Sequence, residues 1–407
     1  MACDTDKKDR VVITGIGIIT SNGENVKEFF QNCVNGISGL KKCSIFDTSN
    51  FSTEYAGEIN KKKYPYLTEN PNEKERIQFL IENCVEEMMK DGQLTKEYIS
   101  SLKNKAYLSF ATSLGTNNKV LQYTKRKTEG NIENEWLLQI SSLLPGIKEL
   151  IGIEGGCYTT TTACAASTTS VGIGYELIKS KKASLVVAGG ADPLSEFSYY
   201  GFNSLRALSK SVCKPFDEER DGINIGEGAG FLILESLENA KKRGVKIYAE
   251  VLGYGINNDA YHITSPDPKG EGAYLSMKMA CGESNNSVEN IDYINAHGTG
   301  TKLNDSMELK AIQRLFQNNN KKVNVSSIKS MVGHCLAAAG IIELILTILS
   351  IDNGICIKNS NLKNEMQGYK NIDLIKDNKN IAIRTALSNN FAFAGNTASI
   401  LVSIYEQ

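Results

Sequence analysis

One cysteine stands where a predicted strand runs into a predicted helix. In residues 158–174, YTTTTACAASTTSVGIG, the threonines at 159–162 favour an extended strand, and the small residues that follow, with apolar residues at helical spacing, favour a helix. Cys164 lies at the junction, where free backbone N–H groups and the positive end of the helix dipole would favour the reactive thiolate. From this stretch alone two interpretations stay open: a nucleophile, or a small residue buried in the core.

Two of the three histidines follow predicted strands, in turns that contain glycine. His297 comes after the strand at 291–296 and begins the sequence HGTGT, and His334 ends the segment KSMVGH after the next strand. His262 lies in a polar loop, NNDAYHITSP. Strand ends carry much of the chemistry of α/β folds, so His297 and His334, each of which could be structural on its own, join Cys164 as candidate active-site residues.

Composition excludes several classes of protein. A formal net charge of −1 over 407 residues gives no overall attraction to nucleic acid or to a membrane surface. The ten cysteines stand singly, without the spacing of a metal site, so we expect no metal and a reducing, cytoplasmic compartment. The charged N-terminus has no apolar signal segment, although a plastid-type compartment stays open if a transit peptide has been removed. The most apolar run, residues 336–351, carries Glu343 and is short for a membrane span, so we expect a buried helix.

The predicted elements follow the same order twice along the chain. Strands are predicted at residues 10–20, 106–114, 159–162, 184–190 and 230–234, and again at 248–254, 291–296, 323–327, 381–387 and 398–404. In each half a central helix rich in small residues follows the third strand, with Cys164 just before one helix and His334 just before the other.

This order predicts an α/β fold of two similar halves. Residues 1–245 would carry the cysteine and residues 246–407 the two histidines. We expect the halves to pack as one five-layered α-β-α-β-α body, with both central helices buried between the sheets. Residues 117–155 are predicted to form a helical insertion.

Several motifs, in the same order along the chain, resemble those of the β-ketoacyl-acyl carrier protein synthases, the condensing enzymes of the thiolase superfamily. The matching segments are RVVITGIGIIT at the start, TACAAS around Cys164, LRALS, PFDEERDGINIGEGAG, DAYHITSP, INAHGTGTKLND, SSIKSMVGHCLAAAG and the tail NNFAFAGNTAS. They cover nearly the whole chain. The resemblance implies a thiolase-like fold and a decarboxylative Claisen condensation, in which a Cys-bound acyl group and malonyl-acyl carrier protein give 3-ketoacyl-acyl carrier protein.

The resemblance also implies roles for single residues. Cys164 would accept the acyl chain, and His297 and His334 would serve decarboxylation and condensation as neutral imidazoles that donate to the enolate oxygen. Lys329 matches an essential site residue close to the second histidine, and Glu308 matches the acid that pairs with it. A buried ion pair with a purely structural role is the alternative for Lys329 and Glu308.

Other matching positions lie around this site. Asp305 matches a nearby second acid, and Thr299 and Thr301 match threonines that hydrogen-bond the pantetheine arm. The backbone N–H groups of Cys164 and Phe393 would hold the tetrahedral oxyanion, with Phe393 in a gating loop. The resemblance implies that the protein binds no cofactor itself and that its substrates arrive on the phosphopantetheine of an acyl carrier protein.

Two departures from the family pattern bear on specificity. The usual tail is Gly-Phe-Gly-Gly, and residues 392–395 read Ala-Phe-Ala-Gly, so we expect the loop to lose access to positive φ and to stiffen. Residues 117–155, which in relatives shape the acyl pocket and the dimer face, are atypical. Carrier docking is expected at a basic cluster, either Lys61–Lys63 or Lys125–Lys127.

These departures favour the catalytic ketosynthase subunit of a type II polyketide system, paired with a paralogous chain-length-factor chain. The alternative is a homodimeric fatty-acid 3-oxoacyl-acyl carrier protein synthase II that elongates saturated chains. A non-catalytic partner subunit is more remote, because Cys164 and both histidines are present. A degradative thiolase would need a second active-site cysteine near the C-terminus, which Cys356, in GICIKN, does not provide.

Overall fold

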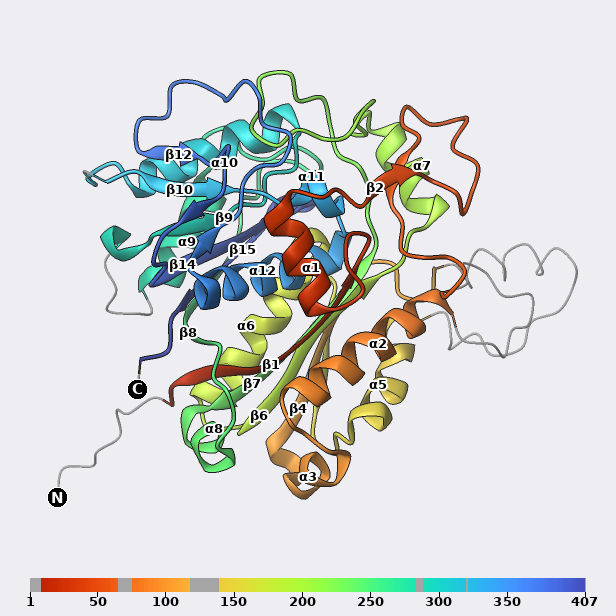
Figure 1. Ribbon diagram of the computed structural model, residues 1–407, viewed down its shortest axis with the longest axis vertical. Coiled ribbons are helices and arrows are strands. Elements are labelled where there is room, and N and C mark those ends of the chain that lie inside the picture. The colour runs from red at the N-terminus through yellow and green to blue at the C-terminus, as the bar shows by residue number, and fades with distance from the viewer. Residues whose placement is uncertain (1–8, 65–74, 118–138, 283–287, 320, 407) are drawn as a thin grey trace, which may run out of the picture.

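One long mixed sheet organises the protein (Figure 1). The computed structural model describes residues 9–64, 75–117, 139–282, 288–319 and 321–406. The strand order is β12-β10-β9-β14-β15-β8-β1-β7-β6-β4-β5. These strands are β1 (Val11–Thr20), β4 (Ala106–Ala111), β5 (Cys157–Thr160), β6 (Leu185–Asp192), β7 (Gly228–Ser236), β8 (Ala249–Asn258), β9 (Tyr293–Asn295), β10 (Val323–Ser326), β12 (Ile372–Leu374), β14 (Thr385–Phe391) and β15 (Asn396–Ser403).

The sheet consists of two halves with the same topology. In the first half β5, β4 and β6 are parallel neighbours, and β7 and β1 follow antiparallel. In the second half β10, β9 and β14 are parallel, and β15 and β8 follow antiparallel. Within the sheet, the two halves are joined where residues 11–13 of β1 pair with residues 249–251 of β8. Two similar α/β halves are therefore present, as the repeated order of predicted elements indicates.

Two central helices fill the space between the halves (Figure 1). These are α6 (Ala166–Lys179) and α12 (Ala339–Asn353), and they share one core cluster with inward side chains of both half-sheets. They approach so closely that a Cβ on Gly340 would lie 2.1 Å from the Thr168 hydroxyl oxygen. The small residues of both helices are needed for this contact.

The apolar helix is a core element, as predicted, but not for the predicted reason. With its leading turn it spans Leu336–Asn353, which is long and apolar enough for a membrane span by length and composition alone. The buried share of this window is 89%, because both half-sheets cover it. Its burial, and not its length, identifies it as a core helix.

Outer helices complete the five layers. On the outer face of the first half, α2 (Arg76–Asp91) packs against β1 and β7. On the outer face of the second half, α9 (Glu271–Gly282) packs against β8 and β15, and α10 (Lys302–Leu315) lies beside α9. Each outer layer has its own apolar cluster. Among the described residues, the other α-helices and short strands are α1 (Val26–Asn35), α3 (Lys96–Ser101), α5 (Leu144–Ile151), α7 (Glu196–Ser204), α8 (Leu237–Arg243), α11 (Lys329–Val332), β2 (Leu40–Lys42), β3 (Tyr55–Gly57), β11 (Ile355–Cys356) and β13 (Lys379–Asn380).

Agreement with the sequence prediction is closest for β1 and β10, whose bounds differ from the predicted strands by one residue. The strand predicted at 381–387 is shifted to Thr385–Phe391, and helices α7, α8 and α10 were not predicted. In the expected insertion, the described residues form a helical turn and α5, which packs against α2. Residues 118–138, and with them the Lys125–Lys127 cluster, lie outside the described residues.

Candidate active site

A cavity of about 390 Å³ brings the three predicted catalytic side chains together. Cys164, His297 and His334 line it, and their sulfur and ring nitrogen atoms lie within 4.8 Å of one another. The two imidazole rings stand edge to face, with 5.3 Å between their centroids. Exposure is only 8% for the cysteine and 1% and 2% for the histidines, so the site is largely dry.

Cys164 lies in a single helical turn, Ala163–Ala165, that leads into α6. Ala163 has φ +49°, in the left-handed region, which costs an alanine about 1 kcal/mol or more and presents Cys164 to the cavity. Burial raises the pKa of the Cys164 thiol to about 12, against the opposing charge of Lys329. The expectation of a resting thiolate is therefore wrong: loss of solvation outweighs the helix end, and the resting group is a thiol.

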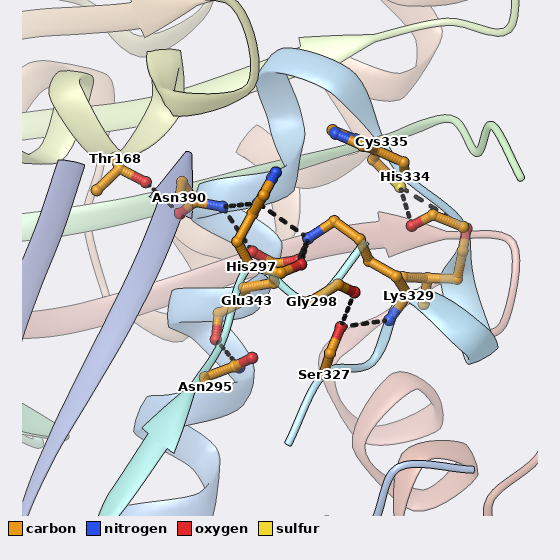
Figure 2. Close-up of polar contacts among 12 residues, drawn as sticks. Thr168, Asn295, His297, Gly298, Ser327, Lys329, His334, Cys335, Glu343 and Asn390 are labelled. Carbon is orange, nitrogen blue, oxygen red and sulfur yellow. Dashed lines mark hydrogen bonds and ion pairs between the residues drawn. The ribbon is translucent and has the colours of Figure 1, made fainter. Parts of the chain in front are cut away.

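His297 is fixed through its backbone. It is also fixed through one ring nitrogen, which Figure 2 shows beside Lys329 and Asn390. The backbone N–H groups of His297 and Gly298 each donate to the Glu308 carboxylate at 2.8 Å. Ring atom Nδ1 faces two donors, Lys329 Nζ at 3.3 Å and Asn390 Nδ2 at 3.4 Å. An atom that faces donors must accept, so the ring proton is on Nε2.

His334 is held in the same tautomer by backbone groups. Its N–H donates to the Asn224 carbonyl at 2.7 Å, and its carbonyl accepts from the Gly226 N–H at 3.0 Å. Its Nδ1 accepts from the Leu336 N–H at 3.1 Å, which again leaves the ring proton on Nε2. The loop that supplies Asn224 and Gly226 is the PFDEERDGINIGEGAG segment, which braces the backbone of His334.

Both imidazoles are neutral at physiological pH. Burial, and after it the nearby Lys329 charge, lowers the pKa of His297 and of His334 well below the ordinary 6.5. The site therefore holds two neutral rings, each with an Nε2 proton available for donation.

Lys329 does reach the site, but its partner differs from the predicted one. Its ammonium group pairs with Glu343 of α12 and donates to the His297 carbonyl at 2.5 Å (Figure 2). Glu308, the predicted partner, instead accepts the two backbone N–H groups around His297, and burial raises its pKa to about 8. The predicted Lys329–Glu308 pair is wrong.

Two further side chains, absent from the prediction, complete this network. Asn390 donates to Glu343 at 2.6 Å and accepts from the Thr168 hydroxyl at 2.5 Å (Figure 2). Thr168 lies on α6, four residues after Cys164, so the network ties the cysteine helix to His297. The available signal was Glu343 itself, a carboxylate within an otherwise apolar buried helix, which must find a partner.

The threonines and the second acid shape the loop after His297. Asp305, fully buried, accepts from the Phe216 N–H at 2.8 Å and the Gly300 N–H at 3.2 Å, and lies 3.6 Å from the Arg220 guanidinium. Thr299 and Thr301 line the cavity with hydroxyl oxygens 2.9 Å apart, and Thr301 also caps α10.

The altered tail adopts the conformation that alanine was expected to prevent. Ala394 has φ +60° and ψ +19°, so the expected loss of positive φ is wrong, and the loop carries the strain instead. Phe393 lines the cavity and packs against Phe202 of α7, with 5.7 Å between ring centroids. The Ala394 N–H donates to the Ile263 carbonyl at 2.8 Å, which joins this loop to the His262 loop.

A thiol and two imidazoles could also form a metal site, but their hydrogen bonds argue against one. A zinc-binding histidine donates its second ring N–H to a carboxylate or carbonyl. Here the second ring nitrogen accepts instead, from Lys329 and Asn390 in one ring and from the Leu336 N–H in the other. Metal binding at Nε2 would move the proton to Nδ1, against those donors, so the residues fit two N–H donors better than two metal ligands.

Known proteins with the same sequence features and fold are condensing enzymes. The model described as the N-terminal domain of β-ketoacyl synthase matches residues 8–240, and the C-terminal domain model matches residues 248–363. The 3-oxoacyl-[acyl-carrier-protein] synthase 2 of Staphylococcus aureus and that of Coxiella burnetii are each 32% identical over 98% of this chain and 99% of their own length.

Solved structures point to the same family. The ishigamide ketosynthase/chain length factor superposes with a TM-score of 0.88 at 30% identity, over 98% of this chain and 100% of the other. A type II polyketide ketosynthase, solved in complex with its acyl-carrier protein and bound to a hexaketide, gives a TM-score of 0.87 at 29% identity over the same shares. With both domain models matched and full-length relatives above 30% identity, the chain belongs to the β-ketoacyl synthase family of condensing enzymes.

Proposed function

We propose that Cys164 is the acylated nucleophile of a β-ketoacyl-acyl carrier protein synthase. Its sulfur attacks the thioester carbonyl of an acyl carrier protein, an S–C bond forms at Cys164, and the carrier thiol leaves with the proton of the Cys164 thiol. A free thiol of this kind persists in a reducing compartment, the cytoplasm, and all cysteines among the described residues are free.

His297 and His334 then support decarboxylation. Loss of CO₂ from a malonyl thioester leaves an enolate, and its oxygen accepts from the two Nε2–H groups. The enolate carbon attacks the Cys164 thioester, the bond to sulfur breaks, and the Cys164 thiolate takes up a proton as 3-ketoacyl carrier protein leaves. One observation carries this proposal: both buried, neutral imidazoles have Nδ1 against a donor, and their ring nitrogens lie within 4.8 Å of the Cys164 sulfur.

Other parts of the cavity supply binding. The backbone N–H groups of Cys164 and Phe393 hold the oxyanion of each tetrahedral intermediate, and Thr299 and Thr301 hydrogen-bond the phosphopantetheine arm. Their support is that all four residues line the cavity. The protein itself holds no cofactor in this scheme, and its two functional halves are residues 1–245 and 246–407.

Mass spectrometry and CO₂ release test the chemistry. Incubation with an acyl donor should add the acyl mass to Cys164, and Cys164→Ala should abolish it. His297→Ala and His334→Ala should still be acylated, yet release CO₂ from malonyl carrier protein about 100- to 1,000-fold more slowly. Acylation mapped to Cys157 or Cys335, or near-normal CO₂ release from both histidine variants, contradicts the proposal.

For the pathway, we propose a type II polyketide ketosynthase that works beside a paralogous chain-length-factor subunit. Its support is the altered 392–395 tail and the likeness to ketosynthases of that kind. The second candidate is fatty-acid elongation by a homodimer, favoured by the names of the sequence relatives. Expression of this chain alone separates them: a stable homodimer with normal turnover on saturated acyl carriers selects the fatty-acid reading.

A further inference from the structure

A buried carboxylate outside the predicted site binds the turn that follows His334. Asp192 ends β6 and is fully buried, and no lysine or arginine pairs with it in the described parts of the chain. One oxygen accepts from the Thr112 hydroxyl at 2.6 Å and from the Ser113 and Leu114 N–H groups at 3.0 and 2.9 Å. The other accepts from the Ala337 N–H at 2.8 Å and from the Ser113 N–H at 3.2 Å. Burial without a cation raises the pKa of Asp192 to about 6, so only strong donors make this position favourable.

The amide of Ala337 is the second-half counterpart of the amide of Cys164. Ala163, with φ +49°, precedes Cys164, and Leu336, with φ +50°, precedes Ala337. Each pair lies in a single helical turn that leads directly into a central helix, α6 or α12. In the second half this turn binds a carboxylate oxygen at 2.8 Å, which shows that its amide is directed at an anion.

The same turn controls the tautomer of His334. The Leu336 N–H donates to His334 Nδ1 at 3.1 Å, and the next N–H, that of Ala337, donates to Asp192. The left-handed region is unfavourable for leucine, so the turn needs an external partner to hold it. Asp192 is the side chain that supplies this partner.

We propose that Asp192 is a positioning residue that fixes the Nε2–H tautomer of His334 through the Leu336–Ala337 turn. This inference rests on the proposed role of His334 as a donor to the enolate. In Asp192→Asn the amide oxygen remains with the three donors at Thr112–Leu114. The new NH₂ group then faces the Ala337 N–H, and the second contact of the Ser113 N–H, donor against donor. The turn then rotates, and His334 Nδ1 loses its donor.

The test measures which nitrogen of each imidazole ring carries the proton. The chain has only three histidines, so ¹⁵N long-range correlation spectra of histidine-labelled, full-length protein resolve each ring. In the wild type we expect His334 in a single Nε2–H form. In Asp192→Asn we expect a mixture of tautomers at His334, no change at His297, and CO₂ release lower by about 10-fold or more, with acylation of Cys164 not slowed.

Two variants keep the test decisive. Glu235→Gln is the matched control, because Glu235 is an equally buried carboxylate whose partners, Thr14, Asn239 and Arg243, lie away from the turn. It should leave the His334 signals unchanged. If Asp192→Asn does not fold, Thr112→Val removes one bond to Asp192, and we expect a smaller shift in the same direction.

The outcomes separate this inference from the proposed function. A single Nε2–H form of His334 in folded Asp192→Asn, or in Thr112→Val if that is the variant that folds, overturns the role of Asp192. A tautomer mixture with normal CO₂ release confirms the role of Asp192 and rejects His334 as a donor to the enolate.

Discussion

Replacing Lys329 and Glu343 one at a time, and then together, separates the structural role of this ion pair from its chemical role. Both side chains are about 1% exposed, so loss of either leaves a buried charge without its main partner. Such a loss costs about 3–5 kcal/mol. For 407 residues, an unfolding entropy of about 2.1 cal/mol/K per residue converts this cost into a fall of about 4–6 °C in Tm.

The double variant Lys329→Met/Glu343→Gln buries no charge. We therefore expect Tm within about 2 °C of the wild type, since a buried pair and its apolar replacement are often of similar stability. CO₂ release should stay about 100-fold or more below the wild type, because His297 Nδ1 keeps only the Asn390 contact at 3.4 Å. Scanning fluorimetry and CO₂ release from malonyl carrier protein measure the two effects separately.

The matched control is Lys329→Met/Glu308→Gln. Glu308 binds the amides of His297 and Gly298 and not the lysine, so this combination should not recover stability. Two results would refute the reasoning. Full CO₂ release by Lys329→Met/Glu343→Gln would make Lys329 purely structural, and recovery of Tm with Glu308→Gln would restore the pairing predicted from sequence.

Three further predictions follow from the electrostatics and the backbone. Because the pKa of the Cys164 thiol is raised to about 12, its alkylation by iodoacetamide should accelerate about tenfold per pH unit from pH 6 to 10. Peptide mass spectrometry measures the rate, and a rate that stops rising below pH 8 would show a thiolate instead. Below pH 6.5 the histidine side chains of the unfolded chain bind protons, whereas the two buried imidazoles of the folded protein stay neutral. The free energy of unfolding therefore falls as the pH falls. The stability difference between wild type and His334→Gln should shrink by about 1.4 kcal/mol per pH unit below 6.5 in urea titrations, and a pH-independent difference would contradict this. Ala394→Gly relieves about 1–2 kcal/mol of left-handed strain but loses about 0.5–1 kcal/mol to the entropy of the unfolded chain. Tm should therefore rise by no more than about 2 °C, while acylation of Cys164 accelerates. A fall in Tm of several degrees would rule out strain at this position.

Local patterns in the sequence were sufficient for the fold and for the identity of the three central residues. Strands buried on both faces read as β-branched runs, and the central helices read as runs of small or apolar residues, so the repeated order was visible without any contact information. Cys164 and His297 adjoin such elements directly, and the motifs around them are contiguous along the chain. The repeated strand order and the place of these residues at the ends of elements were therefore predicted correctly, although helices α7, α8 and α10 were missed.

The partners of these residues depend on contacts between distant segments. Lys329, Glu343, Asn390 and Thr168 come from α11, α12, β14 and α6, and nothing in the spacing of the sequence indicates that Glu343, rather than Glu308, faces the lysine. The same dependence on distant segments explains why a resting thiolate was wrongly expected at Cys164. A helix end is a local feature that favours a thiolate, but the protonation state follows from how much water both halves of the fold exclude from the cavity. Sequence alone determined that Cys164, His297 and His334 stand at the ends of strands and helices, because each position is set by its own segment. The tertiary structure decided their charge, tautomer and pairing, because these depend on burial and on donors supplied from the rest of the chain.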